Sequence, residues 1–183
     1  MTGHKVEPLI LMLRGVNVGG ANRLPMAAFR DMLTGLGLAR VQTYIQSGNA
    51  VFLGARAGLE VRVAEALRVL FGISVPVFLV SVAELAAVMA ANPFAVEGEA
   101  DGAKVHVIFL QGAVRFDPGL AVHATQGEQF HLTERAFYLH TPAGFGKSQM
   151  AEKLAKYLKA EMTGRNQRSA AAILTLAAGL TGT

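Results

Sequence analysis

Cysteine is absent from this 183-residue chain. Its absence excludes disulfide bonds, thiolate metal sites and thiol catalysis. The chain also lacks an uninterrupted apolar segment of the roughly 18 residues that a membrane span requires, since the best candidate, Ala170 to Leu180, is short and contains Thr175 and Gly179. The apolar run from Pro8 to Leu13 is too short for the hydrophobic region of a signal peptide. The lack of a candidate membrane span and of a signal region predicts a cytoplasmic protein that does not interact with a membrane, whereas the absence of cysteine does not by itself identify the compartment.

Charged residues are also scarce, at 16% of the chain, whereas hydrophobic residues make up 52%. This balance is typical of a folded globular protein. The formal net charge of +4 is unevenly distributed: residues 92–134 carry six acids and two bases, and residues 135–183 carry seven bases and two acids. A basic C-terminal region fits an acidic partner, such as a phosphate group or nucleic acid. The alternative is a solvated helix face, because Lys153, Lys156 and Lys159 recur every three residues.

Hydrophobic patterning in the first half predicts the order strand, helix, strand, strand, helix, strand. Apolar residues repeat at helical spacing in two segments and form short runs in the four others. The predicted elements are strands at Leu9–Leu13, Val41–Ile45, Ala50–Leu53 and Val75–Val80, with one helix that starts near Pro25 and another at Leu59–Leu70. This order is that of the ferredoxin-like arrangement.

The second half partly repeats this order. A capping box formed by Ser81 and Glu84 predicts a helix that ends at Asn92, and the acidic segment from Glu97 to Asp101 is interpreted as a connector. Beyond it we predict strands at Val105–Leu110, Gln129–Leu132 and Ala136–His140, a short helix at Asp117–Ala124, a helix at about Lys147–Lys159, and an Ala-rich helix after Thr163-Gly164. The predicted fold class is α+β, with two ferredoxin-like halves, of which the second is incomplete, and an Ala-rich C-terminal helix. The expected divisions are a ferredoxin-like half at residues 1–80, a helix and acidic connector at residues 81–103, and a second α+β half at residues 104–183.

Two polar, Gly-rich motifs follow the first and second predicted strands. Residues 13–20 lie between a strand and a helix start, where free backbone N–H groups favour anions. Residues 44–49 form a turn between two strands. In a β-α-β-β-α-β unit the first and second strands run parallel, so both motifs lie at the same end of the sheet. We therefore expect a polar site that contains Arg14, Asn17, Gln46, Ser47 and Asn49. The alternative is that the glycines only permit tight turns.

A third motif, Gly144 to Ser148, resembles the phosphate-binding loop of nucleotide hydrolases in its Gly-Lys-Ser ending. The resemblance fails at the first glycine of that loop, which is Thr141 here, and no strand ending in Asp follows. A simpler anion site at a helix N-terminus is still an option, with Lys147 adding positive charge. Alternatively, Ser148 only caps the helix.

A fourth motif, Thr163 to Asn166, precedes the last predicted helix. Arg165 could bind a carboxylate or phosphate with two hydrogen bonds. It could equally pair with an acid such as Glu161 and anchor the chain end. Arg165 and Asn166 are therefore included among the candidate ligand residues.

Other catalytic arrangements find little support in the sequence. His106, His123, His131 and His140 lack the spacing of metal ligands, and no Gly-x-Ser-x-Gly motif is present. Neither a metal nor a cofactor is expected, and no catalytic residue is assigned.

The polar motifs together resemble those of the bacterial family called domain of unknown function 1697. The resemblance rests on five segments in a fixed order: Leu13–Gly20, Thr43–Asn49, Asn92–Phe94, Gly144–Ser148 and Thr163–Asn166. Members of that family often carry a tryptophan, and a threonine two residues later, where this chain has Gln167 and Ser169. The resemblance implies a two-part α+β fold and no activity, because the family has no assigned function.

The sequence thus predicts a binding protein for a phosphate-bearing or other anionic ligand. The candidate ligand residues are Arg14, Asn17, Gln46, Ser47, Asn49, Lys147, Ser148, Arg165 and Asn166. One alternative is a metal-independent enzyme that acts on a small anionic substrate, with Ser47 or Tyr44 taking part. Further alternatives are a nucleic-acid-binding module and a homodimer whose motifs build the interface.

Overall fold

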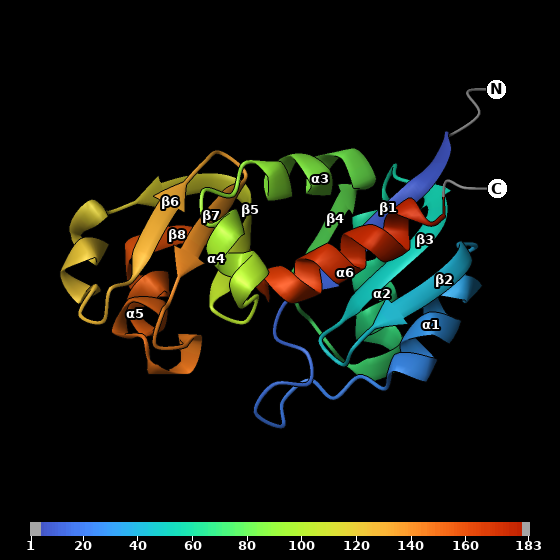
Figure 1. The fold of residues 1–183 in the computed structure, drawn as a ribbon. Helices are drawn as coiled ribbons and strands as arrows, with labels where there is room; N and C mark the ends of the chain where they lie inside the picture. The colour runs from blue at the N-terminus through green and yellow to red at the C-terminus, as the bar shows by residue number, and fades with distance from the viewer. Residues whose placement is uncertain (1–4, 181–183) are drawn as a thin grey trace. The chain divides into compact units, whose positions relative to one another are not determined.

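The computed structural model describes residues 5–180 and shows an α+β fold (Figure 1). Within this range the strands form two four-stranded antiparallel sheets, which confirms the predicted fold class. In chain order the helices and strands, including the 3-10 turns η1 and η2, are β1 (Val6–Leu13), α1 (Met26–Gly35), β2 (Ala39–Tyr44), β3 (Asn49–Ala55), α2 (Leu59–Phe71), β4 (Val77–Ser81), α3 (Val82–Ala90), α4 (Ala95–Ala100), β5 (Val105–Phe116), η1 (Pro118–His123), β6 (Gln129–Leu132), β7 (Ala136–His140), η2 (Phe145–Lys147), α5 (Gln149–Tyr157), β8 (Leu158–Asn166) and α6 (Gln167–Ala178).

The chain forms two compact units. The first consists of the residues up to Ala86 together with those from Ile173 onward, and the second consists of Ala87 to Ala172. Both boundaries fall inside helices, since α3 contains the first and α6 contains the second. The capping box predicted at the start of α3 is present: the Glu84 N–H donates to Ser81 Oγ at 3.1 Å, and the Ser81 N–H donates to Glu84 Oε2 at 2.7 Å.

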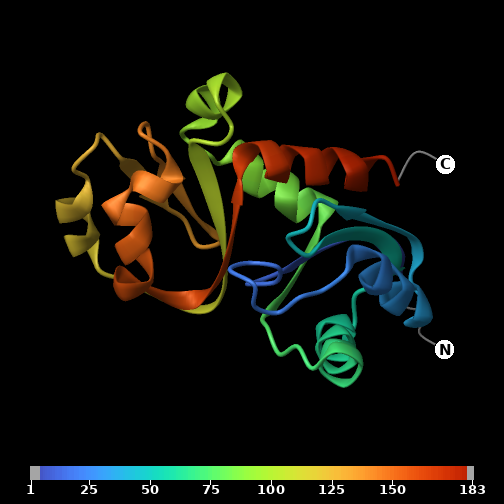
Figure 2. The ribbon, with the colours of Figure 1, turned by 90° about the horizontal axis from the view of Figure 1, so that it is seen from below.

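The sheet of the first unit has the strand order β2-β3-β1-β4. Both β1 and β2 are antiparallel to β3, which lies between them, so β1 and β2 run in the same direction. The chain therefore leaves β1 and β2 at the same end of the sheet, as the sequence predicted. Asn49 of β3 pairs with Met12 in β1 and with Tyr44 in β2, which keeps the two strand ends level. Figure 2 shows the long loop that continues from β1 to α1, residues 14–25.

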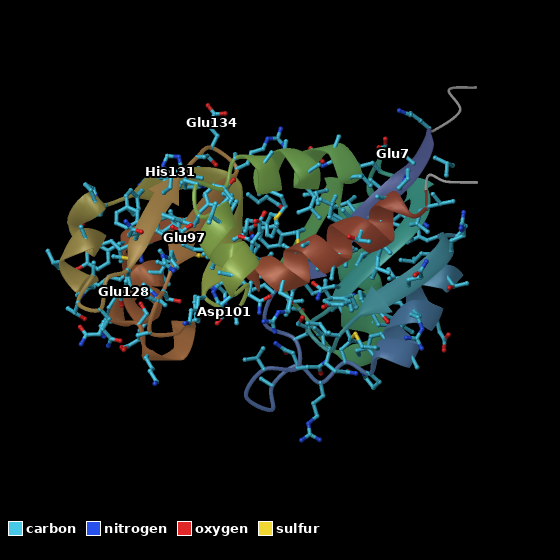
Figure 3. The ribbon with its side chains drawn as sticks, viewed as in Figure 1. Glu7, Glu97, Asp101, Glu128, His131 and Glu134 are labelled. Atoms are coloured by element: carbon cyan, nitrogen blue, oxygen red, sulfur yellow. The ribbon has the colours of Figure 1, made fainter. Side chains whose placement is uncertain are left out.

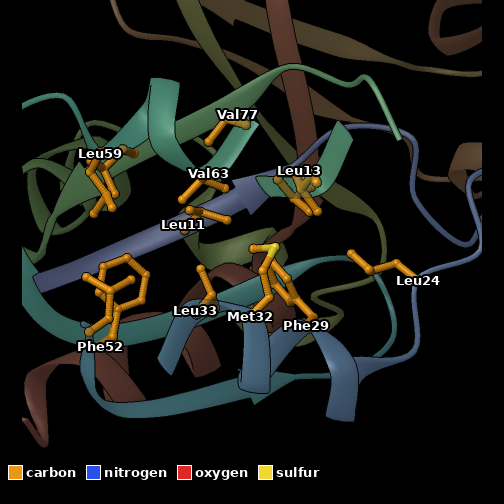
Figure 4. Packing of buried hydrophobic residues seen from close by; sticks show 14 of the residues in the cluster. Leu11, Leu13, Leu24, Phe29, Met32, Leu33, Phe52, Leu59, Val63 and Val77 are labelled. Atoms are coloured by element: carbon orange, nitrogen blue, oxygen red, sulfur yellow. The ribbon is translucent and has the colours of Figure 1, made fainter. Parts of the chain in front are cut away.

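The main core of the first unit packs one face of this sheet against α1 and α2. Figure 4 shows Leu11 and Leu13 of β1 among side chains from both helices, including Phe29 and Val63. Leu24 belongs to the same cluster although it lies in the loop before α1, and it is 1% exposed. Because burial of a leucine side chain contributes about 1.5–3 kcal/mol, Leu24 fixes the far end of the loop to the core.

The sheet of the second unit has the order β6-β7-β5-β8, which repeats the order of the first sheet when the strands are numbered within each unit. The expectation that the second half is incomplete is therefore wrong, because β8 supplies its fourth strand. The lysine spacing suggested a helix as far as Lys159, whereas α5 ends at Tyr157 and Lys159 lies in β8. Pairing with β5, from Leu158 to Asn166, satisfies the backbone of this segment and overrides the local helical pattern.

Two further elements of the second unit differ from the sequence prediction. Residues 97–101, which suggested an acidic connector, lie largely in α4, where Figure 3 labels Glu97. β5 continues past the predicted end at Leu110 to Phe116, because Arg115 and Phe116 pair with β8 and the half-buried Val114 and Phe116 pack against the second core. The register with β8 shifts between Gln111 and Arg115, which marks a bulge.

The core of the second unit lies on the face of its sheet that α5 and η1 cover. Ile108, Phe137 and Leu139 of the sheet pack with Met150 and Leu154 of α5 and with Leu120 of η1. None of the helices in residues 5–180 combines the length and apolar character needed to cross a membrane.

Candidate functional site

The loop after β1 and the turn after β2 meet directly. The Leu13 N–H donates to the carbonyl of Gly48 at 2.9 Å, which joins the end of β1 to the turn. Within the loop, the Asn17 N–H donates to the carbonyl of Asn22 at 3.1 Å. Left-handed backbone conformations make this compact path possible, and they occur at Gly15, Asn17, Gly19, Gly20 and Asn22.

Asn17 connects the loop to the turn through its side chain. Its amide nitrogen donates to the carbonyl of Gln46 at 2.7 Å and to that of Leu24 at 2.9 Å. Its Oδ1 accepts from the Leu24 N–H at 2.8 Å. The sequence suggested Asn17 as a ligand residue, whereas in this structure both its amide hydrogens and its amide oxygen hold protein segments together. Asn17 therefore acts as a positioning residue for the two motifs.

Gly48 permits the close approach of the loop and the turn. Its φ is +72°, and a Cβ added there would lie 2.6 Å from Val16 Cγ2 and 2.8 Å from Leu13 Cβ. Both distances are far inside van der Waals contact, and a side chain at this φ is also strained. The glycine is needed for its conformation and for the space that it leaves.

Asn49 and Ser47 organise the turn from inside. Asn49 is fully buried, and its Nδ2 donates to the Tyr44 carbonyl at 3.1 Å and to Ser47 Oγ at 2.9 Å. Directly after Tyr44, Ile45 has a φ of 48° and is 50% exposed, which is an unusual state for a β-branched residue. The turn is thus a rigid structure that exposes Ile45 and Gln46 to solvent.

A hollow of about 420 Å³ lies beside these two motifs. It is lined by Asn17, Gly20, Arg23, Leu24, Pro25 and Gln46. Pro25 is the N-cap of α1, and neither a side-chain cap nor an acid in the first turn is present at this helix end. Of the predicted site residues, Asn17 and Gln46 line the hollow.

The charge at this hollow is positive. Arg23 is the charged member of its lining, and no acid belongs to that set of described residues. Arg14 and Arg23 are both exposed, and neither guanidinium forms an ion pair within residues 5–180. The sequence analysis missed Arg23 because it lies outside the Gly-rich motif, although its place directly before the start of α1 was a usable signal.

Ser148 and Lys147 lie in the second unit, at the start of α5. Ser148 is 5% exposed and is the N-cap of α5, where its Oγ accepts from the Ala151 N–H at 3.1 Å and donates to Glu128 Oε1 at 2.8 Å. Burial acts to raise the pKa of Glu128, but hydrogen bonds from the Gln126 N–H and Ser148 lower it overall. The Ser148 hydroxyl thus caps the helix, as the alternative interpretation had it, while Lys147 is exposed.

Arg165 and Asn166 also lie in the second unit, at the end of β8. Arg165 is 8% exposed, and its Nη1 donates to Thr163 Oγ1 at 2.9 Å and to the Gly164 carbonyl at 2.7 Å. Burial lowers the pKa of Arg165 to about 10. The Oδ1 of Asn166 accepts from the Ser169 N–H at 2.8 Å, which caps the first turn of α6. Asn166 therefore has a structural function in helix initiation.

Gln167 occupies the position where related sequences often carry tryptophan. Its side chain is buried, accepting from Asn92 Nδ2 at 2.8 Å and donating to the Ala95 carbonyl at 3.1 Å. Gly98 makes room for it, because a Cβ there would lie 2.0 Å from Gln167 Oε1. At this position the chain therefore has a hydrogen-bonded core residue and not an exposed ring.

The histidines form no metal site within residues 5–180, where no group of three or more His, Asp or Glu side chains is placed to hold an ion. His106 packs on Phe145 with ring centroids 3.9 Å apart, and burial lowers its pKa to about 4. The Nδ1 atoms of His106 and His140 are buried without a hydrogen-bond partner. His106 is therefore expected to be a neutral member of the sheet at neutral pH.

The fold defines a two-unit α+β protein with a cationic hollow beside a Gly-rich loop. The chain belongs to the family described as Protein of unknown function (DUF1697), whose sequence pattern matches residues 6–138. The solved structure of the conserved bacterial protein SP0830 from Streptococcus pneumoniae is similar, with 24% identity and a TM-score of 0.66 over 94% of this chain and 99% of that chain. This likeness establishes a shared fold. Comparison with curated proteins gives no match.

Proposed function

We propose that the first unit binds a phosphate-bearing or other small anionic molecule in the hollow beside the Gly-rich loop. The observation that carries the proposal is the composition of the hollow, which combines Arg23 with the uncapped N-terminus of α1 and includes no acid among its described lining residues. A cytoplasmic location fits a chain without cysteine, and it is part of the same proposal.

The N-terminus of α1 favours negative charge. The first N–H groups of a helix lack intrahelical partners and carry the positive end of the helix dipole. In α1 the first N–H with a helical acceptor is that of Phe29, which donates to the Pro25 carbonyl at 3.0 Å. An anion beside Pro25 would accept hydrogen bonds from the free N–H groups of the helix residues that precede Phe29, as anions do at many helix N-termini.

The Gly-rich loop supplies further donors. Within residues 5–180 the N–H groups of Gly19 and Gly20 have no acceptor in the protein. Gly19 and Gly20 are exposed, so these donors are open to a ligand. Gln46 adds a side-chain amide from the turn, and the Asn17 contacts keep the turn at this position.

Thermal-shift and calorimetric titrations with inorganic phosphate, ribose 5-phosphate and AMP test the proposal. A ligand at 100 times its Kd should stabilise the protein by about 2.7 kcal/mol. Replacing Arg23 by Gln removes a charge-assisted hydrogen bond worth about 1.5–3 kcal/mol, so the Kd should rise roughly 10- to 100-fold.

The matched control is Arg115→Gln, which changes an exposed arginine on β5 of the second unit. This variant should bind as the wild type does. Absence of stabilisation by all three compounds, or an equal loss of affinity in both variants, would refute the proposal. Affinity that requires an oligonucleotide and falls steeply with salt would instead indicate a nucleic-acid-binding protein.

A further inference from the structure

The hollow beside the Gly-rich loop is larger than a free phosphate ion requires. Its volume of about 420 Å³ lies within the range of roughly 300–1,000 Å³ that is typical of pockets for whole organic ligands. A phosphate ion placed against Arg23 and the start of α1 would leave most of this space to water. A ligand that fills the hollow therefore carries an organic body attached to its anionic group.

The hollow has a cationic side and a neutral side, and Asn17 lies between them. The Asn17 side-chain nitrogen donates to the Leu24 carbonyl at 2.9 Å and to the Gln46 carbonyl at 2.7 Å. Since the two hydrogens of an amide nitrogen point about 120° apart, these carbonyls lie roughly 5 Å from each other. Arg23 and Pro25 are the chain neighbours of Leu24 and mark the cationic side, and Gln46 lines the neutral side. A ligand bound at Arg23 thus has Gln46 within reach.

Gln46 has a side-chain amide that the protein itself does not use. Its contact with Asn17 is made by the main-chain carbonyl, and within residues 5–180 the exposed side-chain amide has no hydrogen-bond partner. A carboxamide presents a donor and an acceptor side by side. The oxygens of an ionised phosphate only accept hydrogen bonds, so they leave Oε1 of Gln46 unused. A ligand that uses both atoms presents a donor next to an acceptor, as adenine does towards glutamine.

The surface next to the Gln46 amide suits a flat ring. Ile45 directly precedes Gln46 and is 50% exposed at a φ of 48°. Strained residues of this kind persist only where the surrounding structure enforces them, and they are concentrated at functional sites. Pro25, which lines the hollow, is exposed as well. Apolar side chains beside a hydrogen-bonding amide match a nucleobase, which is apolar on its faces and polar at its edge, better than they match a sugar.

We propose that the ligand of this site is an adenine nucleoside monophosphate. Its phosphate lies at Arg23 and the start of α1, and its base pairs with the Gln46 amide. The 6-amino group of the base donates to Oε1, and Nε2 donates to the neighbouring ring nitrogen. This inference rests on the proposed anion site, and it assigns Gln46 as the residue that determines specificity.

Calorimetric titrations with inorganic phosphate, ribose 5-phosphate and AMP separate the two sides of the site. The wild type should bind AMP about tenfold more tightly than ribose 5-phosphate, since only AMP uses the Gln46 amide. Gln46→Ala should weaken AMP binding by about three- to tenfold and leave the Kd values of the other two compounds unchanged. The control Gln111→Ala changes an exposed glutamine on β5 of the second unit and should bind all three compounds as the wild type does.

Removal of the donor from the base tests the same contact from the ligand side. Purine riboside 5′-monophosphate lacks the 6-amino group of AMP, so it should bind the wild type about three- to tenfold more weakly than AMP. The two nucleotides should bind Gln46→Ala equally, because the partner of the amino group is then absent.

The outcomes distinguish this inference from the proposed anion site. AMP binding no tighter than that of ribose 5-phosphate, or an effect of the amino group that persists in Gln46→Ala, overturns the adenine assignment. The anion site stands in that case if inorganic phosphate still binds and Arg23→Gln weakens it. Failure of all three compounds to bind the wild type overturns both.

Discussion

Replacing Gly48 by Ala tests the contact between the Gly-rich loop and the turn. The new methyl group would lie 2.6 Å from Val16 Cγ2 and 2.8 Å from Leu13 Cβ. Both neighbours are 1% exposed members of the first core, so neither can move into solvent. The substitution therefore acts on the backbone conformation and on the packing at the same time.

The two effects can be estimated separately. An alanine at φ +72° carries a conformational cost of roughly 1–2 kcal/mol. Overpacking of a well-filled core costs typically about 1–3 kcal/mol more. The expected loss is thus about 2–5 kcal/mol, a large part of the roughly 5–15 kcal/mol that stabilises a typical protein.

Urea unfolding of the wild type, Gly48→Ala and Gly15→Ala measures this loss. Gly15 has a similar φ of +69°, but nothing lies within 4 Å of a Cβ placed there. Gly15→Ala should therefore show the conformational cost alone, about 1–2 kcal/mol, and Gly48→Ala should be clearly less stable. Equal stability of the two variants would refute the close packing of the loop on the turn.

Three further substitutions test other parts of the structure. Asn17→Ala removes one hydrogen bond from the loop to the turn and two within the loop. The free energy of unfolding should therefore fall by about 2–4 kcal/mol. A decrease below about 0.5 kcal/mol, the lower limit for one such bond, would contradict the positioning role of Asn17. Burial lowers the pKa of His106 from 6.5 to about 4, so between pH 6.5 and 4 the unfolded chain binds more protons than the folded chain. The free energy of unfolding should therefore fall by up to about 3 kcal/mol as the pH is lowered through this range. His106→Leu should flatten this part of the stability profile, and an unchanged profile would exclude the histidine as its cause. Gly98→Ala should displace the buried Gln167 amide and lower the melting temperature despite the better helix propensity of alanine, and a raised melting temperature would contradict the tight packing there.

The sequence was informative where local patterns and the overall topology agree. The hairpin β6–β7 has the predicted limits, since alternation and turn residues act locally. The parallel direction of β1 and β2 followed from the order of the elements alone, and it correctly brought two motifs about thirty residues apart into contact.

The sequence failed where tertiary contacts decide the outcome. β8 was missed because the helical spacing of Lys153 and Lys156 continues to Lys159 inside the strand, and the partner strand β5 lies some fifty residues earlier in the sequence. Asn17 and Gln46 were placed in one group by topology, but sequence could not tell a ligand contact from a hydrogen bond between the motifs themselves. Arg23 entered the candidate site only through the shape of the hollow.

The central claim, an anion site beside the Gly-rich loop, is tested most directly by an NMR titration of the ¹⁵N-labelled protein with inorganic phosphate. We predict saturable amide shifts concentrated at residues 17–25 and 45–48, and their loss in Arg23→Gln. Shifts that do not saturate, or that concentrate around Lys147 in the second unit, would contradict the claim.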